Sequence, residues 1–346
     1  MSKELDREIE LRLERCHEAG ECLYATSNRG RKLLEVRRKR EDLFSPYPGL
    51  YDKRDHWEGL TSNERHLCVA RALSSLHPSW VFCRETAAVA HGLLSLSPGQ
   101  GLRPQLCLVE GCHGAPRHLA DRHYVSPQCP VTVNGIRATS IERTAFDCLR
   151  AFEFSRAMVI ADAVAKNMGD GPGALAASFS AFKGCRGISK ARRRARLADP
   201  RCENGGESIL RANAISLGFA VPEMQVTLSS ALDLSKEYRL DCLWLRKGMT
   251  REWIENRVAS GSLRAGDLDG CVAGELDGRE KYTNPTMVRG DVVDVLLAER
   301  RREAALSLYG LSFVRVSYAE ACSPSFLERA LLTAGVHRMS LPRSDL

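Results

Sequence analysis

The stretch CVAGELDGREKY, residues 271–282, begins as an apolar run and then places acidic residues at alternate positions. Because successive side chains of a β-strand point to opposite faces, Glu275 and Asp277 are predicted to share one face of a strand. Gly278 ends this strand, and Lys281 follows within reach of the same spot. Two neighbouring carboxylates are costly unless a cation lies between them. The stretch therefore predicts a site for a hard divalent ion such as Mg²⁺ or Mn²⁺, which binds oxygen ligands.

The elements around this stretch are predicted to form one domain over residues 202–335, in the order α-β-β-β-α-β. Its helices are expected at 206–217, 291–309 and after Pro324, and its strands at 225–228, 239–245, 271–277 and 311–316. An insertion, residues 246–269, separates the second strand from the third and carries a helix at 250–259. If these two strands are neighbours in the sheet, Asp241 and Glu275 converge on one ion.

Over about residues 200–320, the order of elements and the residue types resemble the PD-(D/E)XK nuclease superfamily, in particular its branch similar to very-short-patch-repair endonucleases. The resemblance is carried by Glu207 in Gly-Glu-Ser, Asp241 in Leu-Asp-Cys-Leu-Trp, Glu275-Leu-Asp277-Gly, Lys281-Tyr282, and the helix 298–306 before Leu308-Tyr309-Gly310. It implies that Asp241 and Glu275 hold Mg²⁺ and that Glu207 adds an outer contact. It also implies a lysine that orients or activates the attacking water.

The chemistry of phosphodiester cleavage fits these residue types independently. Cleavage needs a nucleophilic water and a neutralised developing charge, and a metal held by carboxylates provides both. Lys281 would place positive charge beside the phosphate, and Arg300 and Arg301 would meet the DNA backbone. The superfamily usually has its lysine two residues after the strand glutamate, but that position here is Asp277. The candidate catalytic residues are Glu207, Asp241, Glu275, Asp277 and Lys281, with Asp241 and Glu275 as metal ligands.

The net charge of +7 is concentrated in two short segments. One is a predicted basic linker helix at 181–201, and the other lies at 29–40. Local basic patches on a near-neutral body indicate a polyanion partner, most simply DNA, although a charge run is more often only a solvated helix face. The candidate DNA contacts of the linker helix are Lys190, Arg192, Arg193, Arg194 and Arg196.

The front of the chain is predicted to hold two further domains. Residues 3–19 are expected to form a helix and residues 21–40 one or two more, and 43–51 reads as two short strands around a Pro/Gly turn. This is the outline of a winged helix-turn-helix over 1–60, which places one helix in the major groove. Residues 61–180 are expected to form an α+β domain with helices, then strands, then helices again.

Three motifs in this half look like the AbiEi-type antitoxin family, over about residues 5–165. They are Phe44-Ser45-Pro46-Tyr47-Pro48-Gly49-Leu50-Tyr51, Thr86-Ala87-Ala88-Val89-Ala90-His91-Gly92-Leu93 and Ser140-Ile141-Glu142-Arg143-Thr144-Ala145-Phe146-Asp147. The resemblance implies a winged-helix transcriptional regulator in a toxin–antitoxin or phage-defence locus, with a toxin protein as partner.

Several classes of protein are excluded or disfavoured. No apolar run approaches the roughly 20 residues needed to span a bilayer, and the first ten residues lack the apolar core of a signal peptide. A cytoplasmic protein without a membrane partner is expected. The 13 cysteines are scattered and odd in number, which favours reduced thiols. The spacing of Cys107, Cys112, His113, His118, His123 and Cys129 argues against a structural zinc site.

The sequence thus predicts a multidomain protein of the α+β or α/β class: a winged-helix-like start, an α+β middle domain and a restriction-endonuclease-like end. The leading hypothesis is Mg²⁺-dependent cleavage or nicking of DNA. The alternative is a non-catalytic transcriptional regulator that uses the nuclease fold only for contact, and a third is an interaction protein that neutralises a toxin. The sequence predicts no oligomeric state.

Overall fold

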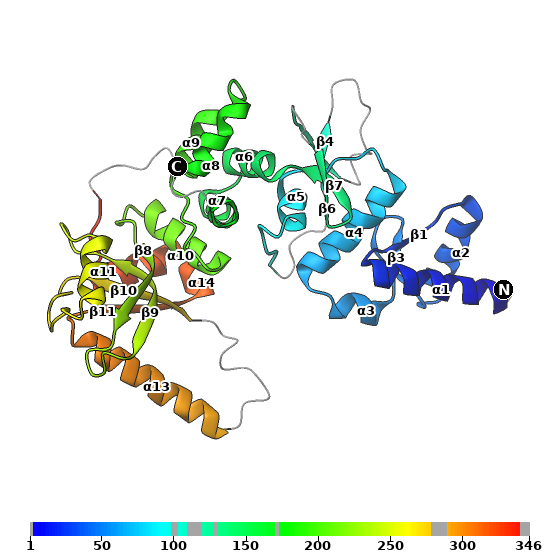
Figure 1. Ribbon diagram of the computed structural model, residues 1–346. Coiled ribbons are helices and arrows are strands. Elements are labelled where there is room, and N and C mark those ends of the chain that lie inside the picture. The colour runs from blue at the N-terminus through cyan, green and yellow to red at the C-terminus, as the bar shows by residue number, and fades with distance from the viewer. Residues whose placement is uncertain are drawn as a thin grey trace. The chain divides into compact units, whose positions relative to one another are not determined.

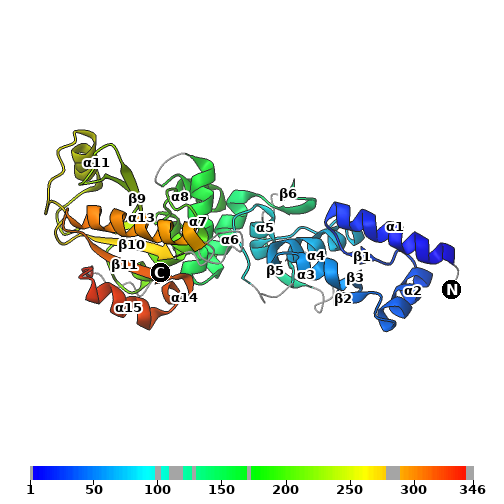
Figure 2. The same cartoon turned by 90° about the horizontal axis from the view of Figure 1, so that it is seen from below.

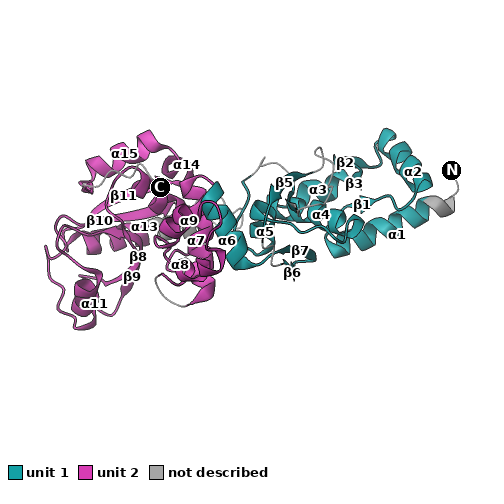
Figure 3. Cartoon of the chain, turned by 90° about the horizontal axis from the view of Figure 1, so that it is seen from above, with its two compact units in different colours: residues 1–151 teal, residues 152–346 magenta. Residues whose placement is uncertain are grey.

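The computed structural model describes residues 3–97, 103–108, 120–126, 130–169, 173–277 and 289–339, and Figure 1 labels its elements. The chain divides into two compact units, Met1–Ala151 and Phe152–Leu346 (Figure 3). Helices and small sheets occur in both units, so the multidomain α+β class is confirmed. The predicted division into four segments stays a prediction, and the one boundary between the units falls inside the predicted segment 61–180. None of the described helices is long and apolar enough to cross a membrane.

Unit 1 begins with a small helical and β-hairpin subdomain. Its elements are α1 (Lys3–Ala19), β1 (Leu23–Tyr24), α2 (Asn28–Lys39), β2 (Phe44–Tyr47), β3 (Leu50–Asp52) and α3 (Arg54–Gly59). The strands form one sheet in the order β1-β3-β2. Ser27 caps α2 by accepting a hydrogen bond from Gly30 N at 3.0 Å. The predicted first helix and hairpin are confirmed, and one helix occupies the basic segment; the winged-helix assignment stays a prediction.

The rest of unit 1 packs helices against short strands. Its elements are α4 (Ser62–Leu76), α5 (Arg84–Ala90), β4 (Gln105–Leu108), β5 (Asp121–Tyr124), β6 (Pro130–Val133), β7 (Ile136–Thr139) and α6 (Ile141–Ala151). The expected order of helices, strands and a further helix is confirmed. Of the Cys/His set between 107 and 129, only Cys107 and His123 lie within the described residues.

Unit 2 is built around a four-stranded sheet in the order β11-β10-β9-β8. Its elements are α7 (Phe154–Met168), α8 (Ala174–Ser178), the 3₁₀ helix η1 (Phe179–Phe182), α9 (Ile188–Ala195), α10 (Gly205–Ser216), β8 (Glu223–Ser229), β9 (Glu237–Trp244), α11 (Arg251–Ala259), β10 (Val272–Asp277), α13 (Arg289–Ser307), β11 (Ser312–Ser317), α14 (Tyr318–Ala321) and α15 (Pro324–Thr333). β10 runs parallel to β11 and antiparallel to β9. The predicted α-β-β-β-α-β order is confirmed from α10 to β11.

Helices cover both faces of this sheet, as Figure 2 shows for α13 above and α15 below β10 and β11. On one face, Leu210 of α10 and Leu327 of α15 pack against Trp244 and Val272. On the other, Leu306 of α13 and Ile254 of α11 join a second apolar cluster with Leu228, Leu243 and Ala273. The insertion between β9 and β10 therefore contributes α11 to the core of the unit.

Gly274 allows β10 to pass close to β9. A Cβ at this position would lie 2.5 Å from Cys242 Sγ and 2.6 Å from Trp244 Cζ3, both fully buried side chains. We expect Gly274→Ala to lower the free energy of unfolding by about 1–3 kcal/mol because the packed ring and thiol must shift. Urea unfolding checks this, with Gly59→Ala as the control, since its added methyl meets nothing within 4 Å. Equal effects of the two substitutions would contradict the packing described.

Candidate metal centre and active site

The sheet of unit 2 brings Asp241 and Glu275 together at the point where β9 and β10 separate. The two strands pair over Val272↔Trp244, Ala273↔Leu243 and Gly274↔Cys242, after which β10 continues only with β11. Extending the register by one residue sets Glu275 opposite Asp241. The charge of Asp241 acts on Glu275, which agrees with this placement. The two predicted metal ligands therefore lie near each other, just beyond the last paired residues of β9 and β10.

Where the backbones of β9 and β10 stop pairing, the side chain of Asp241 accepts a hydrogen bond from β10 instead. Leu276 N donates a hydrogen bond to Asp241 Oδ2 at 2.8 Å. On the other side of β9, the register with β8 skips the position of Gln225, which has a φ of 53°. A non-glycine residue in this region is uncommon and is often found at functional sites. The sheet is thus irregular on both sides of Asp241.

Glu275 is a buried carboxylate, only 9% exposed. Arg302 Nη2 of α13 donates a hydrogen bond to Glu275 Oε1 at 2.7 Å. Burial raises the pKa of Glu275 to about 7; the Arg302 charge opposes this rise, and the Asp241 charge adds to it. Arg302 supplies one positive charge to this pair of carboxylates, and burial is the main cause of the raised pKa of Glu275.

Glu207 approaches from the first turn of α10. It is 3% exposed and accepts hydrogen bonds from Glu203 N (2.9 Å), Asn204 Nδ2 (2.7 Å) and Gln225 Nε2 (2.9 Å). Burial raises the pKa of Glu207, and the Asp241 charge contributes to the rise. The close approach of α10 to β10 depends on Gly206, where a Cβ would lie 2.5 Å from Leu276 Cδ2.

All three carboxylates influence the pKa of one buried thiol, that of Cys242. The pKa of Cys242 is raised mainly by burial, and then by the charges of Asp241, Glu275 and Glu207. The structure therefore brings these three predicted residues, which are widely separated in the sequence, into one electrostatic neighbourhood.

The other two predicted catalytic residues are Asp277 and Lys281. Asp277 has a side chain that is 47% exposed, and its Oδ1 lies 4.0 Å from Arg315 Nη1. Arg315 Nη1 also lies 3.4 Å from Glu299 Oε2, and Arg315 Nη2 lies 3.7 Å from Glu303 Oε2. The structure places Asp277 at the rim with these α13 residues rather than with the buried carboxylates. Lys281 lies outside the described residues.

Sequence reasoning missed Arg302 and selected its neighbours Arg300 and Arg301, which are exposed. Besides Glu275, Arg302 Nη2 contacts the backbone oxygen of Arg239 at 2.6 Å, so it bridges the two strands where they separate. Helix periodicity could have found Arg302. It precedes the buried Leu306 by four positions and therefore lies on the same face of the helix. Gln225 was also missed, and no local pattern marks it.

The basic helix α9 is only partly available to DNA. Arg193 and Arg196 are exposed, and Lys190 and Arg192 are half-buried. Arg194 is 2% exposed: its Nη1 donates to the Phe152 carbonyl at 2.7 Å. Arg194 is therefore a packing residue, and its predicted role as a DNA contact is corrected.

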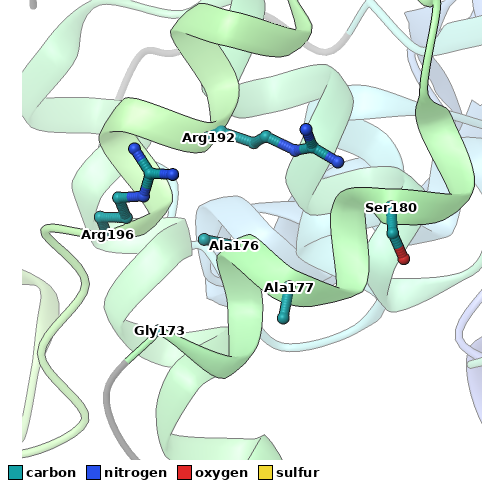
Figure 4. Close-up of a pocket in the computed structure, with 6 residues that line it drawn as sticks. All are labelled: Gly173, Ala176, Ala177, Ser180, Arg192 and Arg196. Carbon is teal, nitrogen blue, oxygen red and sulfur yellow. The ribbon is translucent and has the colours of Figure 1, made fainter.

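Figure 4 shows an open pocket beside this helix, lined by Gly173, Ala176, Ala177, Ser180, Arg192 and Arg196.

The donor chemistry at Asp241 and Glu275 fits a hard divalent cation. Both residues offer carboxylate oxygens, which are the ligands of Mg²⁺, and a cation bound between them would offset the repulsion by which Asp241 raises the pKa of Glu275. A second place in the chain, in unit 1, gathers more potential metal ligands within a short distance of one another. Among the described residues, the three potential ligands gathered within 4.8 Å of one another are His17, Asp52 and His56 of unit 1.

The pKa of Glu275 predicts how stability depends on pH without divalent ions. Between about pH 4.5 and 7 the folded protein holds a proton that the unfolded chain releases, so stability falls as pH rises, by at most roughly 3 kcal/mol. Glu275→Gln should remove this loss and make the protein more stable than the unaltered chain at about pH 8, but not at about pH 4. Urea unfolding at both values checks this; parallel pH profiles of the two proteins would contradict it.

Comparison with known proteins adds no family assignment. No family model matches the chain, and no curated protein matches it. The resemblances to PD-(D/E)XK nucleases and to AbiEi-type antitoxins therefore stay predictions.

Proposed function

We propose that unit 2 is a Mg²⁺-dependent, PD-(D/E)XK-like endonuclease domain that cleaves or nicks DNA in the cytoplasm. The observation that supports this most is the convergence of Glu207, Asp241 and Glu275 where β9 and β10 separate. Carboxylates from neighbouring strands and a helix terminus are suited to hold a divalent ion beside a phosphate.

Each residue has a role in this proposal. Asp241 and Glu275 would hold the ion, which when bound supplies charge stabilisation and lowers the pKa of water. Gln225 of β8 donates a hydrogen bond to Glu207, and this bond fixes the Glu207 carboxylate. Leu276 N–H orients Asp241 in the same way. Lys281 would orient or activate the water, and Arg300 and Arg301 would contact DNA phosphates.

Unit 1 is proposed to bind DNA as a winged-helix-like regulator in a toxin–antitoxin or defence context, with a toxin protein as a further partner. The support is the charge of α2. Its basic side chains are largely exposed, at Arg29, Arg31, Lys32, Arg38 and Lys39. A helix of this kind can lie against the phosphate backbone and enter the major groove.

The nuclease proposal is tested on supercoiled plasmid. Purified full-length protein is incubated with Mg²⁺, with Mn²⁺, and with EDTA, and relaxed and linear forms are separated on a gel. We expect relaxed or linear DNA with either ion and none with EDTA. Equal amounts of relaxed DNA in all samples would overturn the proposal, because the activity would then not need the ion.

One observation favours the second candidate, a non-catalytic DNA-binding regulator. The guanidinium of Arg302 already gives Glu275 a cationic partner at 2.7 Å, as a structural ion pair would. This candidate predicts salt-sensitive DNA binding that is independent of Mg²⁺ and unchanged in Asp241→Asn. Binding of this kind without any cleavage would replace the first candidate by the second.

Both candidates predict that the exposed arginines of α9 contact phosphates. Changing Arg193 and Arg196 together to Gln should lower the slope of log K against log salt concentration by up to about 2, since each phosphate contact contributes roughly 0.9. Fluorescence anisotropy of a labelled duplex at several salt concentrations measures this slope. Lys236→Gln, at an exposed residue of unit 2, is the control. An unchanged slope in the double variant would remove α9 from the DNA interface.

A further inference from the structure

Two histidines of unit 1 share one buried carboxylate. His17 lies in the last turn of α1, Asp52 ends β3, and His56 lies in α3. His17 Nε2 is 2.8 Å from Asp52 Oδ1, and His56 Nδ1 is 3.0 Å from Asp52 Oδ2. The two imidazole rings are stacked, with centroids 3.6 Å apart. Three separate elements thus deliver three potential metal ligands to one point.

The carboxylate at the centre of this cluster needs a cation. The Asp52 side chain is only 1% exposed, and it also accepts a hydrogen bond from Lys53 N at 2.7 Å. Within the described part of the chain, the ion-pair partners of Asp52 are the two imidazoles, and neither Lys nor Arg is among them. A buried carboxylate is costly unless positive charge, from a protonated imidazole or from a bound metal ion, compensates it.

The distances suit a small transition metal. Ligands at about 2.0–2.1 Å from a tetrahedral Zn²⁺ lie roughly 3.3 Å from one another. The nitrogen–oxygen separations of 2.8 and 3.0 Å are those of hydrogen bonds and need only a small lengthening to reach that edge, and all three ligand atoms lie within 4.8 Å of one another. The nearly parallel rings must tilt for both nitrogens to face one ion, which is a motion about the soft χ2 torsion.

We propose that His17, Asp52 and His56 form a binding site for a divalent transition metal, with Zn²⁺ as the ion that fits best. Two imidazoles and one carboxylate are a recurrent zinc ligand set. The His17 and His56 side chains are 24% and 27% exposed, so a fourth position is open to water. The ion would tie α1, β3 and α3 together within the subdomain that also contains the basic helix α2.

The test is a Zn²⁺ titration of the full-length protein after removal of metals with EDTA and dialysis, in competition with a chromogenic chelator. We expect one tightly bound Zn²⁺ per chain at this site and a rise in the unfolding temperature of unit 1. Loss of a metal's outer-shell partner typically weakens binding 10- to 100-fold, so loss of a ligand in His17→Gln or His56→Gln should cost at least about 100-fold.

Two controls make the result specific. His77→Gln, whose ring stacks on Trp80 away from any carboxylate partner in the described contacts, should bind Zn²⁺ as the unaltered chain does. Asp241→Asn should also leave this binding unchanged, which separates it from the carboxylate site of unit 2. Zn²⁺ affinity that is the same in His17→Gln, His56→Gln and the unaltered protein would overturn the proposal.

A measurement on the unaltered protein tests the site even if the histidine variants fail to fold. X-ray absorption at the zinc edge, with one equivalent of Zn²⁺ bound, should give the scattering of two imidazoles and further oxygen or nitrogen ligands. A spectrum without imidazole, or with sulfur ligands, would reject the site.

Discussion

Glu275→Gln is expected to lower the rate of Mg²⁺-dependent plasmid nicking by about 10³-fold. The substitution keeps the shape of the side chain and removes the negative charge that would hold the ion. Loss of several kcal/mol of charge stabilisation, taken as about 4 kcal/mol, corresponds to this factor. Initial rates of nicking at saturating DNA measure it.

Glu237→Gln is the matched control, because Glu237 is an exposed glutamate of the adjacent strand β9. It should retain the unaltered rate. The pH argument predicts that Glu275→Gln is more stable than the unaltered protein near neutral pH, so that unfolding will not explain lost activity. Unchanged nicking in Glu275→Gln would show that the activity comes from another site or another protein.

Asp147→Ala is expected to lower the free energy of unfolding of unit 1 by about 3–5 kcal/mol. Arg143 and Asp147 form a two-pronged ion pair in α6, with Nε–Oδ2 and Nη2–Oδ1 distances of 2.8 and 3.0 Å. Both side chains are at most 2% exposed. Removing one partner of a buried ion pair is strongly destabilising, and Asp147 is also the partner of Arg150, whose Nη2 lies 2.7 Å from Asp147 Oδ1.

Thermal and urea unfolding followed by circular dichroism measures this loss. Glu142→Ala is the control, an exposed acidic residue on the same helix, and it should change stability by less than about 0.5 kcal/mol. Similar losses in the two variants would mean that the ion pair does not hold α6 in place. Arg143 and Asp147 belong to the third motif of the AbiEi resemblance, and the structure gives them a packing role.

Local patterns predicted much of unit 2. The alternation of Glu275 and Asp277 and the glycines at element ends were sufficient for the order from α10 to β11, because these signals need only neighbouring residues. From the sequence, the pairing of β9 with β10 was only a condition, and the structure shows it. The insertion 246–269 gave no hint that α11 would join the core, since burial of Ile254 depends on the partner strands.

The contacts that the sequence did not predict are those set by tertiary packing. Arg194 and Arg193 are adjacent and chemically identical, yet one is buried against Phe152 and the other is exposed. The cluster of His17, Asp52 and His56 joins residues 35 positions apart with no spacing motif. Such sites become visible only when the helices and strands that carry them are placed together.

The most direct test of the central claim is a crystal of the full-length protein soaked in Mn²⁺, with anomalous diffraction recorded. We predict an anomalous peak between Asp241 and Glu275, bonded to one carboxylate oxygen of each at about 2.0–2.3 Å. An ion at this position would require Arg302 either to release its hydrogen bond to Glu275 or to bind Glu275 together with the ion. A map in which the space between Asp241 and Glu275 holds no peak, with Arg302 still bonded to Glu275, would contradict the account.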